Sequence, residues 1–86
     1  MLHNKTIELN KEIVEILSKI TRIDLKGITY STLILEELGI DSLMAIEILA
    51  RVEKQFDIII EESLLADVNT VGDFVNTIEE KINIGN

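Results

Sequence analysis

The sequence predicts one all-α domain with three main helices and one short helix. Three separate stretches place their apolar residues at helical spacing, and no stretch sustains the alternation of a β-strand. The chain has 86 residues, of which 47% are hydrophobic and 3% aromatic, and it contains neither proline nor cysteine. Its core must therefore be aliphatic and must hold without disulfides or thiolate-bound metal. We expect a single domain over residues 1–86, ordered from about 6 to 83.

The first helix is expected over about residues 7–20. Its buried stripe follows i, i+3, i+4, i+7 spacing: Ile13, Ile16, Leu17 and Ile20. Three residues can each cap its start, and the pattern does not choose among them: Asn4, Thr6 and Asn10. A long connection follows from about Ile23 to Gly39, and three leucines are expected to fix it to the core: Leu33, Leu35 and Leu38. Gly39 is expected to adopt the left-handed conformation that ends a helical turn.

The second helix is expected to begin at Asp41 or Ser42 and to run to about Phe56, because both side chains can accept N–H groups of a first turn. Its buried stripe consists of Ala45, Ile48, Leu49, Val52 and Phe56. A short helical turn is expected at about residues 63–66. The last helix is expected from about residue 71 to 82, with Thr70 and Asp73 as a capping pair. Its inward residues are Val71, Phe74, Val75, Ile78 and Ile82.

The second helix also has an outward face with more apolar residues than its packing needs. At about 100° per residue this face holds Leu43, Ile46, Glu47, Ala50 and Lys54, with Glu47, Arg51 and Glu53 around it. Two interpretations stay open: the face is a docking surface, or the connection over residues 23–39 folds over it. Single exposed apolar residues are also ordinary on small proteins.

The charge excludes some partners. Sixteen acidic residues against eight basic ones give a net charge of −8, which disfavours nucleic acid and anionic membranes and favours basic partners. Acidity can equally serve solubility alone. No apolar run approaches the length of a membrane span, and the first residues do not form a signal peptide. We therefore expect a soluble, cytoplasmic monomer.

The segment before the second helix carries a motif. An Asp-Ser pair before an apolar helix is by itself an ordinary cap. However, Gly39-Ile40-Asp41-Ser42-Leu43 resembles the attachment motif of acyl and peptidyl carrier proteins, which is Gly, one variable residue, then Asp-Ser-Leu. The similarity continues through residues 46–49, 52–57 and 69–74, and it covers most of the chain from residue 32 to 82.

This resemblance implies an acyl-carrier-like bundle and a carrier that is not itself an enzyme. It implies that a phosphopantetheinyl transferase attaches 4′-phosphopantetheine from coenzyme A to Ser42 through a phosphodiester, with Asp41 as the flanking motif residue. The position suits a phosphate, because a helix N-terminus favours negative charge. Acyl groups would travel as thioesters on the thiol of this arm, between acyltransferase, ketosynthase or other synthase enzymes. Partner contacts are expected on the outward side of the second helix, at Leu43, Met44, Ile46, Glu47 and Ala50.

Three residues depart from the fatty-acid-synthesis members of this family. Met44 and Ile59 stand where those proteins usually carry acidic residues, and Glu61 replaces a proline. The run Ser42-Leu43-Met44-Ala45 is more similar to carriers of polyketide or nonribosomal peptide assembly. The pathway is therefore left open between these and fatty acid biosynthesis.

Other function classes fit less well. A hydrolase built on Ser42 needs a base, and the one histidine, His3, lies near the N-terminus, where we expect fraying. Asp67-Val68-Asn69 is the nearest fragment to a calcium loop, and no ladder of ligands follows it. A D-alanyl or aminoacyl carrier stays open, because the cargo leaves little trace in the sequence. A helical interaction module, with Ser42 as a plain cap, also stays open.

Overall fold

Three α-helices carry the fold: α1 over Leu2–Thr21, α2 over Ser42–Phe56 and α3 over Val71–Ile84. Two short 3₁₀ helices, η1 over Leu25–Gly27 and η2 over Glu62–Asp67, lie in the connections. This computed structural model describes the backbone of residues 2–84 and the side chains of residues 8–83. The expected all-α class, with three main helices and a short one after the second, is confirmed.

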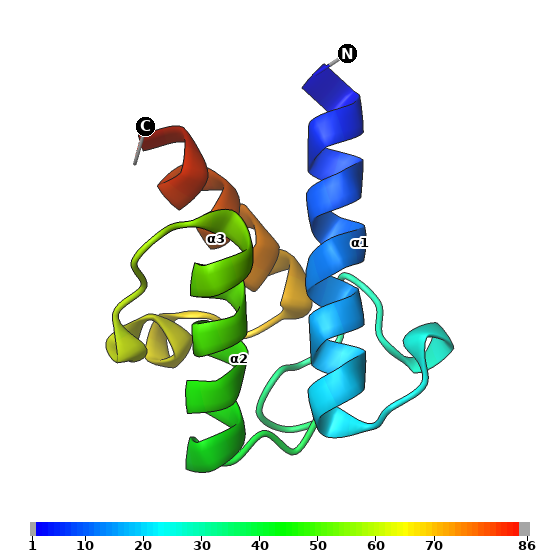
Figure 1. Ribbon diagram of the computed structural model, residues 1–86. Coiled ribbons are helices and arrows are strands. Elements are labelled where there is room, and N and C mark those ends of the chain that lie inside the picture. Colours follow the sequence, from blue (N-terminus) through cyan, green and yellow to red (C-terminus); the bar gives the residue numbers. More distant parts are fainter. Residues whose placement is uncertain (1, 85–86) are drawn as a thin grey trace.

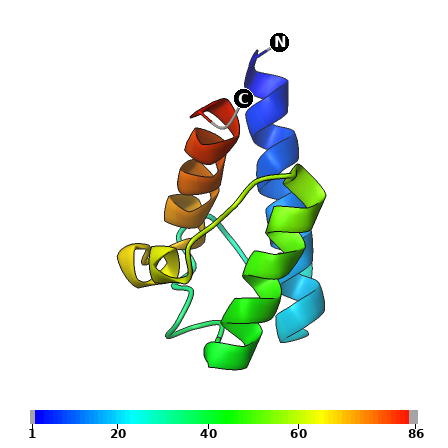
Figure 2. The same ribbon diagram turned by 60° about the vertical axis from the view of Figure 1, so that its left-hand side comes forward.

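The central element is α1, because it packs against both α2 and α3. Figure 1 shows α2 and α3 on the same side of α1, and η2 beside α2. In the turned view of Figure 2, η2 lies at the outer edge of the molecule, at the end of the segment that leaves α2. None of the helices within residues 2–84 is long and apolar enough to cross a membrane.

The core is aliphatic around one phenylalanine. Its most deeply buried side chains come from the three helices and the first connection: Phe74, Ile13, Leu17, Ile34, Ile48, Ile78, Val52, Val71 and Val75. Removing each such side chain from water contributes about 1.5–3 kcal/mol. Four residues expected in the core are only half-buried and pack against its edge: Ile20, Ala45, Phe56 and Ile82.

Helix α1 begins earlier than the sequence pattern predicts. It starts at Leu2, so Asn4, Thr6 and Asn10 all lie inside the helix and none of them caps it. No proline or glycine precedes residue 7, so nothing in the sequence stops the helix from extending toward the N-terminus. The side chains of Asn4, Thr6 and His3 lie outside the described residues. At the other end, Arg22 takes a left-handed conformation (φ 65°) and closes the helix.

The connection between α1 and α2 is fixed to the start of α3 by backbone hydrogen bonds. Leu33 and Thr70 form an isolated antiparallel bridge, and the N–H of Val71 donates to the carbonyl of Thr32 at 2.9 Å. The connection therefore runs alongside the start of α3 before it leads into α2.

This pairing corrects the prediction for the three leucines. Leu38 is buried as expected, but Leu33 is half-buried and Leu35 is 54% exposed. Successive side chains of an extended segment point to opposite sides, so Ile34 takes the inward position next to the bridged Leu33. The buried hydrophobic side chains of the connection are Ile28, Ile34, Leu38 and Ile40, and Thr32 is buried beside them.

The capping pair predicted at the start of α3 is confirmed. The N–H of Asp73 donates to Thr70 Oγ1 at 3.1 Å, and the N–H of Thr70 donates to Asp73 Oδ2 at 3.2 Å. The same carboxylate oxygen also accepts the N–H of Asn69 at 3.1 Å. These N–H groups, first that of Thr70, lower the pKa of the Asp73 carboxyl, because each favours the charged form.

Candidate functional site

Ser42 is the first residue of α2, and its side chain is exposed. The residues before it set its position. Gly39 has the predicted left-handed conformation (φ 64°), and Ile40 is 7% exposed and anchors the turn in the core. Asp41 is the N-cap: its side chain accepts the N–H of Met44 at 2.8 Å. The choice left open by the sequence is thus settled, because Asp41 caps the helix and the Ser42 hydroxyl stays available.

The backbone at this helix end suits an anion. The first N–H groups of an α-helix have no acceptor inside the helix, and the helix dipole adds partial positive charge there. Asp41 takes two N–H groups of the first turn, that of Met44 through its side chain and that of Ala45 through its carbonyl at 2.9 Å. The N–H groups of Ser42 and Leu43 lie before these two, at the same end as the Ser42 hydroxyl. A phosphate on that hydroxyl would meet a favourable potential.

A cleft of about 210 Å³ lies beside Ser42, between α2 and η2. Four apolar side chains and one carboxylate complete its lining: Ala45, Ile46, Leu49, Leu65 and Glu62. The sequence pattern did not point to Glu62 or Leu65 as site residues. The connection of only a few residues between α2 and η2 was the available signal, since it keeps η2 close to α2.

The outward face of α2 is open. Leu43 is 79% exposed and Ile46 is 50% exposed, and Glu47 and Ala50 are exposed as well. The alternative that the first connection covers these residues is wrong, because that connection lies against the start of α3.

Two residues of α2 differ from their expected positions. Met44 is half-buried and packs against the core, because it lies about 100° around the helix from Leu43. Glu53 does not border the outward face as a free charge: its side chain turns toward the segment after α2, where Glu53 Oε2 accepts the N–H of Ile60 at 2.7 Å. The acidic border of the face is therefore smaller than the sequence suggests.

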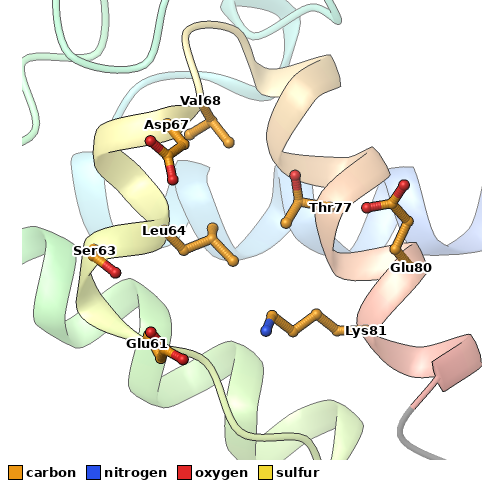
Figure 3. A pocket seen from close by; sticks show the side chains of 8 residues that line it. All are labelled: Glu61, Ser63, Leu64, Asp67, Val68, Thr77, Glu80 and Lys81. Carbon is orange, nitrogen blue, oxygen red and sulfur yellow. The ribbon is translucent and has the colours of Figure 1, made fainter.

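A second pocket, of about 330 Å³, lies between η2 and α3. Figure 3 shows that its lining is mostly polar, with the Lys81 side chain reaching from α3 toward η2. Ser63 stands at its edge, on a 3₁₀ turn that offers no α-helix N-terminus for a phosphate. This pocket lies on the α3 side of η2, whereas the cleft beside Ser42 lies on the α2 side.

The comparisons with known proteins agree with this geometry. A family model that describes the phosphopantetheine attachment site matches residues 11–78. The chain belongs to the phosphopantetheine-binding acyl carrier protein family. As a member of this family it carries acyl groups on a 4′-phosphopantetheine arm and is not itself a catalyst, as the sequence predicts.

Three of these comparisons extend over most of both chains. The acyl carrier protein of Thermotoga maritima is 28% identical over 75 residues, which cover 87% of this chain and 93% of the relative. That of Cylindrotheca sp. is 35% identical over 72 residues, which cover 84% and 90%. A solved Mycobacterium tuberculosis protein described as an acyl carrier protein has a TM-score of 0.70 and 27% identity, over 91% of this acyl carrier chain and 99% of that one.

Proposed function

We propose that Ser42 is the residue that carries the arm, and that the chain passes acyl thioesters between synthase enzymes. The observation that supports it is the place of Ser42: an exposed hydroxyl on the first residue of α2, beside a helix end whose cap is made by Asp41. Modification then costs the helix no capping bond.

The other serines fit an attachment site less well. Ser18 is half-buried, and its hydroxyl donates to the carbonyl of Ile23 at 2.6 Å. Ser31 lies in the first connection and Ser63 in a 3₁₀ turn, so neither lies at the start of an α-helix. Ser42 alone among the four combines exposure with an α-helix N-terminus.

The attachment reaction needs only a nucleophile from this chain. Ser42 Oγ forms a bond to the phosphorus that bears the pantetheine unit of coenzyme A. The bond from that phosphorus to the adenosine 3′,5′-bisphosphate leaving group breaks, and the hydroxyl proton passes to a base of the transferase. When bound, the arm supplies a thiol that holds acyl groups as reactive thioesters.

Partner enzymes are proposed to dock on the outward face of α2, at Leu43, Ile46, Glu47 and Ala50, with the accessible part of Met44. These residues directly follow Ser42, so an enzyme that grips them holds the root of the arm at its own entrance. Leu43 and Ile46 provide the apolar contacts that a stable interface buries at its centre. The partners we propose are a phosphopantetheinyl transferase and acyltransferase or ketosynthase enzymes.

Intact-mass measurement after coexpression with a broad-specificity phosphopantetheinyl transferase tests the attachment site. The wild-type chain should gain one phosphopantetheine unit and Ser42→Ala none, while the control Ser63→Ala should gain it in full. A gain by Ser42→Ala, or no gain by the wild type, would contradict the proposal.

A further inference from the structure

The negative charge of the chain is not spread evenly. Helix α2 carries two acidic and two basic residues, and α1 carries three of each, so both helices are neutral overall. Residues 57–67, which include η2, carry four acidic residues and no basic one: Asp57, Glu61, Glu62 and Asp67. Residues 57–67 therefore hold half of the net charge of −8, beside the proposed docking face, whereas α2 itself contributes no net charge.

The basic residues of α2 lie on its outward side. Arg51 and Lys54 are exposed, and both line a shallow hollow on the surface of α2. Lys54 belongs to the same stripe of α2 as three of the proposed docking residues. The stripe follows i, i+4, i+7, i+11 spacing and consists of Leu43, Glu47, Ala50 and Lys54. At 1.5 Å per residue, Arg51 lies about 14 Å and Lys54 about 18 Å from Ser42 along the helix.

Two carboxylates on α1 and α2 hold hydrogen bonds to other groups. Glu53 accepts the N–H of Ile60. Glu12, on α1, accepts a hydrogen bond from Gln55 Nε2 at 2.6 Å. Glu47 remains as the acidic member of the hollow's lining, against two cations. The lining of this hollow therefore carries more positive than negative charge, although the whole chain is acidic.

We propose that the enzymes that dock on this stripe carry an acidic patch about 14–18 Å from the entrance that receives the arm, and that this patch pairs with Arg51 and Lys54. The inference rests on the proposed function, since it assumes that α2 is the docking face. An interface that covers Leu43 and Ile46 removes water from their neighbours, so cations on the same stripe need anionic partners. A partner that is basic throughout would instead place its cations against Arg51 and Lys54.

The net charge of the chain and the charged residues at the interface then act over different distances. Salt screens charges beyond about 8 Å at physiological ionic strength, so contact is governed by the residues at the interface. The acidic flank at residues 57–67 can still attract a basic region of the same partner. Together the two regions fix the direction in which α2 lies on the enzyme, with Ser42 at the entrance.

The test measures phosphopantetheine transfer from coenzyme A with a transferase that converts the wild-type chain. Arg51→Glu, Lys54→Glu and Lys54→Gln are compared with Lys26→Glu, which makes the same change of charge on η1, across α1 from α2 in Figure 1. We expect kcat/KM to fall about fivefold or more for each glutamate variant through KM, with kcat little changed. Lys54→Gln should lie between Lys54→Glu and the wild type, and Lys26→Glu should stay within about twofold of the wild type.

Circular dichroism at the assay temperature must show that each variant is folded, because Lys54 lies in the last turn of α2, where a cation is favourable. Equal or faster transfer by the two glutamate variants would overturn the inference, since it would place neutral or basic groups opposite the stripe. The inference would also be overturned if kcat/KM did not fall in the order Lys, Gln, Glu at position 54. If the wild type gains no arm with any transferase, the attachment proposal fails instead, which is a separate result.

Discussion

Gly72 and Tyr30 lie so close that a side chain at Gly72 would have to displace Tyr30. A Cβ atom there would lie 2.7 Å from Tyr30 Cδ2, and the N–H of Gly72 donates to the carbonyl of Tyr30 at 2.8 Å. The Tyr30 hydroxyl also donates to Asn76 Oδ1 at 3.2 Å. Tyr30 thus fastens the connection that leads to Ser42 against the first turns of α3.

Gly72→Ala should therefore destabilise the domain by about 1–3 kcal/mol, because the methyl group must displace the ring or the backbone. The measurement is chemical denaturation followed by circular dichroism. Tyr30→Ala/Gly72→Ala should lose less than the sum of the two single variants, since the double variant lacks the ring atoms that the methyl group meets and keeps only the Tyr30 carbonyl at 3.1 Å. Asn76→Ala is the matched control, which removes only the exposed hydrogen bond and should cost under about 1 kcal/mol. Additive losses in the double variant would show that the two residues do not act on each other.

The cap of α2 gives a prediction that separates stability from modification. Asp41→Ala should cost about 0.5–2 kcal/mol, because Met44 loses the acceptor of its N–H. Ser42→Ala should cost much less, since Ser42 already lies inside the helix. Thermal melting of the two unmodified variants, with Asp41→Asn as a conservative control that keeps an acceptor, measures the difference. Equal losses for Asp41→Ala and Ser42→Ala would contradict this division of roles.

How far the sequence predicts the molecule depends on the range of the interaction. The start of α2, the left-handed Gly39 and the pair Thr70–Asp73 are set by neighbours within a few residues, and they are confirmed. The exposure of Leu35 depends on the pairing of the connection with α3, which lies far along the chain and is not contained in any local pattern. The first turns of α1 were missed for another reason, because three equally good caps concealed an uninterrupted helix.

The candidate site shows the same limit. The motif around Ser42 is local, so the sequence alone identified the position of the hydroxyl. Glu62 and Leu65 reach the cleft only because η2 folds back on α2. The diversion of Glu53 toward Ile60 likewise needs the path of the chain after α2. The net charge of the helix could not reveal the orientation of Glu53, because a net charge does not give the position of each side chain.

Acid should weaken the start of α3 through Asp73. Its pKa is lowered by the N–H groups of Thr70 and Asn69, so the charged form is favoured in the folded chain. A carboxyl with a depressed pKa stabilises the fold at pH values above its unfolded pKa, for which the reference value is 3.8, and that stabilisation is lost as pH falls through the folded pKa. The difference in stability between the wild type and Asp73→Asn should therefore be constant at neutral pH and shrink below about pH 4. Denaturation of both chains from pH 7 to 2.5 measures this, and a difference that grows in acid would contradict it.

Met44 and Ile59 are the two positions where an acidic residue of fatty-acid-synthesis carriers is replaced by an apolar one, but the structure separates them. Met44 is half-buried against the core, whereas Ile59 is 84% exposed. Met44→Asp would place a carboxylate in a half-buried position and should destabilise the domain by about 1–3 kcal/mol. A change in transfer rate by this variant could then not be assigned to partner binding alone. Ile59 is therefore the position at which pathway preference can be measured cleanly.

Ile59→Glu should change stability by less than about 0.5 kcal/mol, because its side chain contacts little else. An exposed isoleucine suits an apolar pocket on a partner, and a glutamate suits a basic one. We therefore expect Ile59→Glu to speed acyl transfer with fatty-acid-synthesis enzymes and to slow it with polyketide-type enzymes. Leu25→Glu is the matched control, because Leu25 is 48% exposed on η1 and lies across α1 from the docking face in Figure 1. If Ile59→Glu and Leu25→Glu alter both sets of rates equally, Ile59 only adds to net charge and takes no part in partner choice.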